Sequence, residues 1–370
     1  MSGDRDDPGT GPAAVGRGGS AGAADRRAAG EVAGGFRPGL PGGRGGGADG
    51  PEAAWSARAA EGALLVVGDV ITDVVARHRG PLASGTDTVA AVRTVPGGAG
   101  ANVACWAAYE GCADVRLLGR VGGETAAWHE RELAASGVRP LLVTDPEAPT
   151  GTVICLVDTG ASAERTFLTD SGASLRLAPD DWSPALLDGV ARLHLSGYLF
   201  FSGPSRALVS VALESTRARG VPVSLDPASA GFLTELGVDR FLELSEGVDV
   251  LLPSRDEAYL LTGLPDPAGA AAELSRRFPL VVAKQGDGGA LVARSGTVRA
   301  RVPALPVTPQ DTTGAGDAFT GAFLAALLSG AGAEEAAKAG CAAGARAVER
   351  VGGRPPSERR PCHGEETGVR

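Results

Sequence analysis

The sequence predicts an α/β protein in which a mostly parallel sheet is covered by helices on both faces. Two observations lead to this prediction. From about Val190 onward, short apolar runs alternate with stretches of helical periodicity, a pattern typical of parallel strands joined by helical crossovers. The apolar runs are also continuous rather than alternating with polar residues, which indicates strands that are buried on both faces.

The two ends of the chain differ from this pattern. Residues 1–60 are rich in Gly, Ala, Arg and Asp and almost devoid of large apolar side chains, so we expect a disordered extension. The GxGxxG match at residues 45–50 follows no strand and precedes no helix, so we interpret it as chance. A folded domain is expected over 61–356 and a flexible tail over 357–370.

The domain begins with the apolar run ALLVV at residues 63–67, which predicts a buried strand. Asp69, Thr72 and Asp73 follow it at the strand's carboxyl end, where ligands bind in open α/β sheets. Asp69 and Asp73 could also be ordinary turn residues without a ligand. We favour the turn role for Asp69 and the ligand-binding role for Asp73.

A small second sheet is predicted from two stretches, 76–96 and 150–170. Residues 86–95 alternate weakly, and the turn at 158–162 separates two runs rich in β-branched and aromatic residues, which indicates a hairpin. We interpret this sheet as a lid, because lids exclude water and complete catalytic sites. Its exposed edges could be covered by a second copy of the chain.

The remaining elements follow in order. Apolar runs predict strands at 115–118, 193–197, 221–226, 248–253 and 280–286. Helical periodicity predicts a helix after Asn102, one through Trp128 and Leu133, one through Glu257 and Leu261, and others over 205–219, 239–244, 318–329 and 333–350.

The stretch DTTGAGD at residues 311–317 is the most informative motif. Phe319, Phe323 and Leu327 behind it lie at helical spacing. A Gly-rich turn that leads into a helix presents free backbone N–H groups to an anion. A carboxylate in that turn would repel a phosphate, so we expect Asp317 to hold the group that attacks the phosphate. The motif therefore predicts phosphoryl transfer.

A second glycine-rich turn, GGAGAN at residues 97–102, also leads into a helix. Its glycines allow the backbone to approach a ligand closely, and Asn102 offers both a donor and an acceptor. An ordinary strand-to-helix turn with Asn102 as a buried cap explains the same residues equally well.

Composition excludes several other classes of protein. The net charge is −9 and no long basic block occurs, so nucleic-acid binding is not expected. No apolar run reaches the roughly 20 residues that a membrane span needs. Five cysteines without a CxxC pair and four scattered histidines argue for reduced thiols in the cytoplasm and against a zinc site.

No Walker A sequence (GxxxxGK[ST]) is present. Instead, GGAGAN and the complete DTTGAGD motif resemble the two signatures of the ribokinase-like (PfkB) carbohydrate kinases, and the resemblance spans about residues 63–353. It implies a Rossmann-like core with a β-lid, ATP and Mg²⁺, and as acceptor a hydroxyl group of a sugar or nucleoside. A non-catalytic sugar sensor is the alternative outside the kinases.

The resemblance also implies roles for individual residues. Asp317 would be the base, and the backbone of Gly314, Ala315 and Gly316 the anion hole. Asp73, with the turn of Gly97, Gly98 and Asn102, would hold the acceptor. The donor side would comprise Ser254, Lys284, Gly286 and Thr312 for ATP, Glu257 for Mg²⁺ by an indirect contact, and Asp311 with Thr313 for a monovalent cation such as K⁺.

Two positions depart from the family pattern. Ser254 stands where the family has Asn in its Pro-Asn-x-x-Glu element, and a serine hydroxyl reaches less far than an amide. Lys284 stands where relatives often have Thr, and a lysine there could pair with a phosphate. At Asp317 we expect the dipole of the following helix to keep the carboxylate ionised and weakly basic. Phe167 is the one aromatic candidate in the lid, so a sugar is favoured over a nucleoside.

Overall fold

The computed structural model of this chain describes residues 62–158 and 165–356, all within the compact unit Asp49–Arg370. The predictions for the segments 1–60 and 357–370, and for the turn at 158–162 beyond Asp158, lie outside the described residues. Within the described ranges no helix is long and apolar enough to cross a membrane.

A nine-stranded sheet forms the centre of this unit, in the order β13-β12-β11-β10-β9-β8-β1-β4-β5. The strands from β11 to β5 pair in parallel, whereas β12 and β13 are added antiparallel at one edge. This confirms the predicted mostly parallel sheet. The strands are β1 (Ala63–Val67), β4 (Val115–Gly122), β5 (Val138–Asp145), β8 (Val190–Ser196), β9 (Val223–Asp226), β10 (Val250–Leu251), β11 (Leu280–Lys284), β12 (Ala290–Arg294) and β13 (Thr297–Val302).

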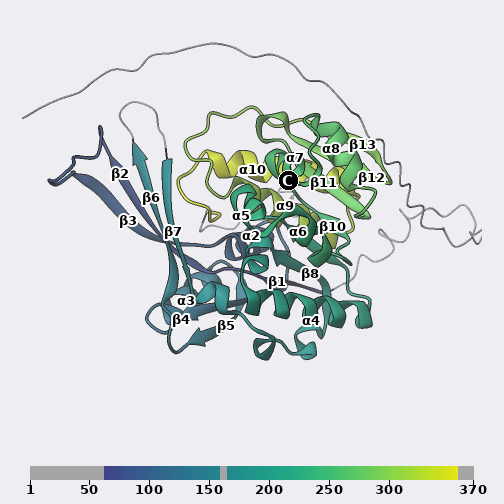
Figure 1. Cartoon of the computed structure of the whole chain (residues 1–370), viewed down its shortest axis with the longest axis horizontal. Coiled ribbons are helices and arrows are strands. Elements are labelled where there is room, and N and C mark those ends of the chain that lie inside the picture. Colours follow the sequence, from purple (N-terminus) through teal and green to yellow (C-terminus); the bar gives the residue numbers. More distant parts are fainter. Residues whose placement is uncertain (1–61, 159–164, 357–370) are drawn as a thin grey trace, which may run out of the picture. The chain divides into compact units, whose positions relative to one another are not determined.

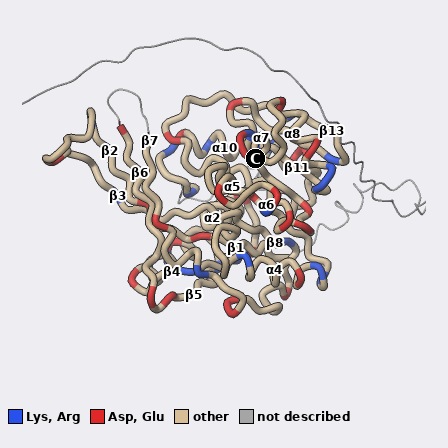
Figure 2. Tube along the Cα trace, viewed as in Figure 1, with Lys and Arg blue, Asp and Glu red and all other residues tan. Residues whose placement is uncertain are grey.

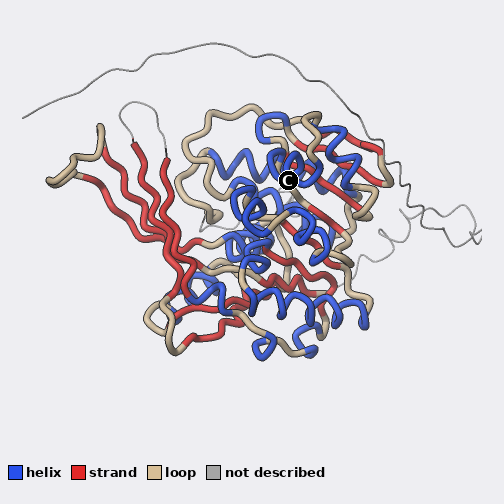
Figure 3. Tube along the Cα trace, viewed as in Figure 1, coloured by secondary structure: helices blue, strands red, loops and turns tan. Residues whose placement is uncertain are grey.

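Helices cover both faces of this sheet (Figure 3). Side chains of β1 alternate between two apolar cores, because successive residues of a strand point to opposite faces. Leu65 packs with the first group of helices and Leu64 with the second. The first group comprises α4 (Gly203–Arg219), α5 (Ala230–Leu236), α6 (Val238–Leu244), α7 (Arg255–Thr262) and α8 (Pro267–Leu274), and the second α2 (Ala99–Tyr109), α3 (Ala126–Ala135), α9 (Ala315–Leu328) and α10 (Ala333–Val348).

A separate four-stranded sheet stands beside the helices, at the left of Figure 1. Its order is β3-β2-β6-β7, with β2 (Ile71–His78), β3 (Ala90–Gly97), β6 (Thr150–Asp158) and β7 (Arg165–Gly172). β6 and β7 pair antiparallel, as the hairpin prediction required.

One boundary was predicted wrongly. The chain leaves β1 after Val67 and enters β2 at Ile71, so Asp73 lies within a strand of the small sheet and not at the end of the first strand. The short break is possible because Gly68 has no side chain: a Cβ there would lie 2.9 Å from Cα of Gly100.

Candidate functional site

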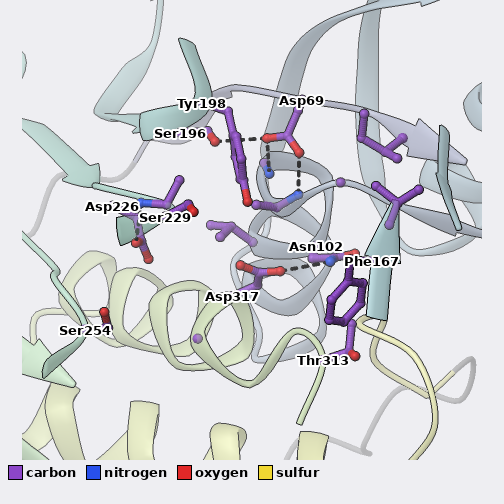
Figure 4. Close-up of a pocket in the computed structure, with 18 of the residues that line it drawn as sticks. Asp69, Asn102, Phe167, Ser196, Tyr198, Asp226, Ser229, Ser254, Thr313 and Asp317 are labelled. Carbon is purple, nitrogen blue, oxygen red and sulfur yellow. Dashed lines mark hydrogen bonds between the residues drawn. The ribbon is translucent and has the colours of Figure 1, made fainter. Parts of the chain in front are cut away.

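A pocket of about 770 Å³ lies between the carboxyl ends of the parallel strands and the small sheet (Figure 4). The large sheet contributes residues that follow or end its strands, such as Asp69, Ser196 and Asp226. The small sheet contributes side chains from each of its four strands: Asp73, Val75, Val95, Val153, Cys155 and Phe167.

The glycine-rich turn is fixed by Asp69. One carboxylate oxygen of Asp69 accepts a hydrogen bond from Ala99 N (2.7 Å), and the other accepts from Gly100 N (3.1 Å) and Ser196 Oγ (2.9 Å). These bonds satisfy free N–H groups at the start of α2. Gly98 has φ 93°, and a Cβ there would lie 2.5 Å from the carbonyl oxygen of Asp69, so the turn requires glycine. Asp69 therefore has a structural role, the reading that its sequence position favoured.

Asp73 projects from β2 into the pocket and lies directly over Gly97, where a side chain would collide with its carboxylate. Burial raises the pKa of Asp73 to about 6; the positive charge of Arg354 opposes this rise, and the neighbouring carboxylates of Asp69 and Asp311 add to it. The carboxyl group is thus placed to bind hydroxyl groups, and it is ionised above about pH 6.

Asp317 lies in the first turn of α9, whose N-cap residue Gly314 has φ 73°. Asn102 Nδ2 donates a hydrogen bond of 2.8 Å to Asp317 Oδ2 (Figure 4). Burial raises the pKa of Asp317 to about 7, with Asp226 and Asp69 adding to the rise, while the Asn102 hydrogen bond and Lys284 oppose it. The expectation of a weakly basic carboxylate is therefore wrong, because burial and neighbouring acids outweigh the helix dipole.

Lys284, at the end of β11, forms an ion pair of 2.5 Å with Asp226 at the end of β9. Thr320 Oγ1 of α9 also donates to Asp226, at 2.9 Å. Burial lowers the pKa of Lys284, but the carboxylates of Asp226 and Glu257 outweigh it and the net shift is upward, so the ammonium stays charged. A Cβ on Gly316 would lie 3.5 Å from Lys284 Nζ, which places this charge beside the first turn of α9.

Ser254 and Glu257 form a capping box at the start of α7. Glu257 N donates to Ser254 Oγ at 3.3 Å, and Ser254 N donates to Glu257 Oε2 at 2.7 Å. Glu257 is buried, and this burial, with the nearby charge of Asp226, raises its pKa. Both side chains line the pocket, but the Ser254 hydroxyl is already engaged by the helix.

Asp311 is held by two backbone groups. Thr313 N donates to Asp311 Oδ1 (2.8 Å) and Gly352 N to Asp311 Oδ2 (3.0 Å). The hydroxyl of Thr313 is buried without a hydrogen-bond partner in the described structure. Asp311, Thr313, Gly286 and Gly316 line the pocket, whereas Gly97, Thr312, Gly314 and Ala315 are not among its described lining residues.

The charges around the pocket are mostly negative; Figure 2 draws the Asp and Glu residues of the described chain in red. Lys284 and Arg255 are the basic residues among the described lining residues. The acidic ones are Asp69, Asp73, Asp226, Asp256, Glu257, Asp287, Asp311 and Asp317. No group of three or more His, Cys, Asp or Glu side chains within the described ranges is arranged to hold a metal ion.

Four residues of this region were missed by sequence reasoning. Asp226 ends an apolar run in the same way that Asp69 follows one, so that signal was available. Tyr198 and Phe232 line the pocket and contact each other edge to face, with ring centroids 5.7 Å apart. Each follows a strand, β8 and β9 respectively, but at a different distance from the strand end, so no common sequence pattern marks them. Arg354 lies behind the pocket and had no signal of its own.

The chain is similar in sequence to known sugar kinases. A family model described as "pfkB family carbohydrate kinase" matches residues 62–360. A fructokinase of Klebsiella pneumoniae is 32% identical over 278 residues, which cover 72% of this chain and 85% of the relative. A ribokinase of Bacillus subtilis is 29% identical over 284 residues, covering 74% and 88%.

Solved structures show the same fold. A putative ribokinase II from E. coli, in complex with ATP and Mg²⁺, superposes with a TM-score of 0.71 at 25% identity, over 79% of this chain and 94% of that one. An adenosine kinase from Sinorhizobium meliloti superposes with a TM-score of 0.71 at 23% identity, over 80% and 96%.

Proposed function

The chain belongs to the pfkB family of carbohydrate kinases, and on this basis we propose that it transfers the γ-phosphoryl group of ATP to a hydroxyl group of an uncharged sugar or nucleoside. The observation that carries the proposal is the position of Asp317. Its carboxylate lies in the first turn of α9, bonded to Asn102 and beside the charge of Lys284, where an attacking hydroxyl group and a phosphate can meet.

In the proposed mechanism, Asp73 and Asn102 bind hydroxyl groups of the acceptor and orient one of them toward Asp317. Asp317 accepts the proton of that hydroxyl group as the hydroxyl oxygen forms a bond to the γ-phosphorus. The bond between the γ-phosphorus and the bridging oxygen of ATP breaks, and ADP leaves. Its pKa of about 7 suits a general base at neutral pH. The first N–H groups of α9 and the Lys284 ammonium stabilise the charge on the transferring group.

The donor side also fits the ions that the family implies. Mg²⁺ is usually bound through one or two carboxylates together with substrate phosphates, and Glu257 and Asp226 are the two acidic pocket residues that we propose would hold it. The ion would neutralise charge on the phosphates. For a monovalent cation, Asp311 and the unpartnered hydroxyl of Thr313 offer oxygen ligands. Stimulation of turnover by K⁺ over a K⁺-free buffer tests that part.

The acceptor is proposed to be uncharged because Lys284 and Arg255, the basic residues among the described lining residues, belong to or adjoin the proposed donor side. A nucleoside is the second candidate, and one observation favours it. Phe167 of β7 lines the pocket with 51% of its surface exposed, which leaves an aromatic face free to stack on a base.

Two further proposals concern the compartment of the protein and its assembly. The cysteines within the described ranges are free thiols, which fits a reducing compartment such as the cytoplasm. Val89, directly before β3, and Val92, within β3, are 92% and 59% exposed, and a second copy of the chain would cover them. Light scattering of the purified protein tests this dimer.

The test is ATP consumption by the purified protein with free pentoses, hexoses, sugar acids, sugar phosphates and nucleosides. We expect turnover with a neutral sugar or nucleoside. Asp317→Asn should lower turnover by about 10³-fold and leave ATP binding, measured by calorimetry, unchanged. Near-normal turnover of this variant would refute the role of Asp317, and no turnover with any acceptor would favour the sensor.

A further inference from the structure

The segment 352–354, which follows α10, contacts the loop before α9, helix α2 and the glycine-rich turn. Gly352 N donates to Asp311 (3.0 Å), and Gly353 O accepts from Trp106 Nε1 of α2 (2.9 Å). Arg354 Nη2 donates to the carbonyl oxygen of Gly97 (3.2 Å), and Nη1 contacts the thiol of Cys105. This segment therefore ties the loop before α9 to the glycine-rich turn.

The packing of segment 352–354 against Asn102 and Gly314 leaves no space for side chains on Gly353 and Gly314. A Cβ on Gly353 would lie 2.5 Å from Asn102 Nδ2, and one on Gly314 would collide with Gly353. The backbone of segment 352–354 is thus in direct contact with both loops, and Arg354 is held at a fixed place behind Gly97.

The charge at this place acts on Asp73, whose carboxylate lies over Gly97. Asp69 and Asp311 also face Asp73, and both disfavour its ionised form. His129 of α3, bonded to Thr72, is neutral because burial, aided by Arg354, lowers its pKa to about 4. Arg354 is the cation that opposes these effects.

We propose that Arg354 is a positioning residue for the acceptor substrate: it fixes the Gly97 carbonyl group and places a positive charge beside Asp73, which then binds substrate hydroxyl groups as a carboxylate. The part that concerns the substrate rests on the proposed function. The effect of Arg354 on Asp73 does not, so the two can fail separately.

The first experiment measures Asp73 without any substrate. Protein labelled with ¹³C-aspartate is titrated by NMR, and the Asp73 carboxyl signal is identified by its loss in Asp73→Asn. We expect a pKa near 6 in the unmodified protein and about one unit higher in Arg354→Gln, a tenfold change in proton affinity. Arg354→Lys should restore most of the difference.

Arg346→Gln is the matched control, since Arg346 pairs with Glu110 and does not line the pocket. It should leave the titration of Asp73 unchanged. An unchanged Asp73 titration in Arg354→Gln would overturn the proposal. Thermal unfolding of each variant establishes that it is folded, and Arg354→Lys provides the second variant if Arg354→Gln is not.

The second experiment measures turnover with D-fructose or D-ribose, whichever is phosphorylated. Arg354→Gln should raise KM for the sugar about twofold at pH 7 and about fivefold at pH 6, because less of Asp73 is then ionised. KM for ATP should stay unchanged, and the loss should diminish as pH rises. In an Asp73→Asn background the same substitution should add little, because both changes act on one interaction. Fully additive, pH-independent losses would overturn the proposal; no turnover with any acceptor would instead overturn the proposed function.

Discussion

Asn102 donates a 2.8 Å hydrogen bond to Asp317, and its replacement by alanine should change the pH dependence of turnover. The bond stabilises the ionised carboxylate and thereby opposes the rise in pKa that burial causes. Without this bond, the pKa of Asp317 should rise above its present value of about 7. The base would then be protonated over more of the neutral range.

The size of this effect follows from the titration of one group. Hydrogen bonds to charged groups contribute about 1.5–3 kcal/mol, and water will replace part of this one, so a rise of about one pKa unit is expected. At pH 7 the ionised fraction of Asp317 would fall from about one half to about one tenth. Turnover should therefore fall about fivefold at pH 7 from protonation alone, and that part of the loss should vanish near pH 9.

The assay is kcat against pH from about 5.5 to 9.5, at saturating ATP and acceptor. Asn102→Asp is the stronger perturbation, because two carboxylates that share a site cannot both ionise easily. A direct spectroscopic test is also available, since Asn102 is the only asparagine among the 370 residues. In protein labelled with ¹⁵N-asparagine, its single side-chain amide signal should shift as Asp317 titrates, and the shift should disappear in Asp317→Asn.

Two results would refute this reasoning. The first is a loss of turnover in Asn102→Ala that is the same at every pH, which would mean that Asn102 contacts only the substrate. The second is an amide signal that does not respond between about pH 6 and 8, the range in which a group with this pKa titrates. Either result would mean that Asn102 does not affect the pKa of Asp317.

Three further predictions follow from the same contacts. In the folded protein the pKa of Asp317 is raised from its ordinary value of 3.8 to about 7, so ionisation of Asp317 destabilises the fold as pH rises from about 4 through 7. In urea unfolding, Asp317→Asn should therefore be more stable than the unmodified protein by about 4 kcal/mol at pH 8 and nearly equal to it near pH 4. Lys284→Met should raise KM for ATP at least tenfold. The control is Lys338→Met, which changes the chain's only other lysine, on the exposed side of α10, and should leave KM for ATP unchanged. Equal effects of the two substitutions would refute a donor-side role of Lys284. Phe167→Ala should weaken binding of a nucleoside by about 1–2 kcal/mol and of a free sugar much less, with the neighbouring exposed Leu168→Ala as control; an equal loss for both ligands would contradict base stacking.

Much of the fold could be predicted because it depends on local patterns. The run ALLVV of β1 is buried throughout, and such runs are recognisable in the sequence. β5 was not predicted because Pro140 interrupts it, and proline usually argues against a strand. The structure accommodates Pro140 because β5 is the edge strand of the large sheet, and an edge position follows from strand order, which local sequence does not contain.

The site residues that belong to local motifs could be predicted in the same way, whereas the contacts between them could not. Asp317 and Asn102 belong to local motifs, so each could be identified alone, but their hydrogen bond joins residues 215 positions apart. Arg354 could not be identified, because its importance comes from contact with Gly97, 257 positions away. Asp226 is the intermediate case: its place after a strand was visible, whereas its ion pair with Lys284 required the order of β9, β10 and β11.

The error about the basicity of Asp317 shows which physical term sequence reasoning lacked. The dipole of α9 is a local property, and it favours an ionised carboxylate at the first turn. Burial depends on the packing of α9 against α2 and on the pocket wall, and it acts in the opposite direction. The acids that end or follow β1 and β9, Asp69 and Asp226, act in the same direction as burial. The opposing groups, Asn102 and Lys284, are the two that contact or adjoin the reacting centre.

A substrate that draws Asn102 or Lys284 away from Asp317 would therefore raise the pKa of the Asp317 carboxyl group. The pKa measured from kcat, with substrates bound, should then exceed the pKa measured by NMR in the free protein.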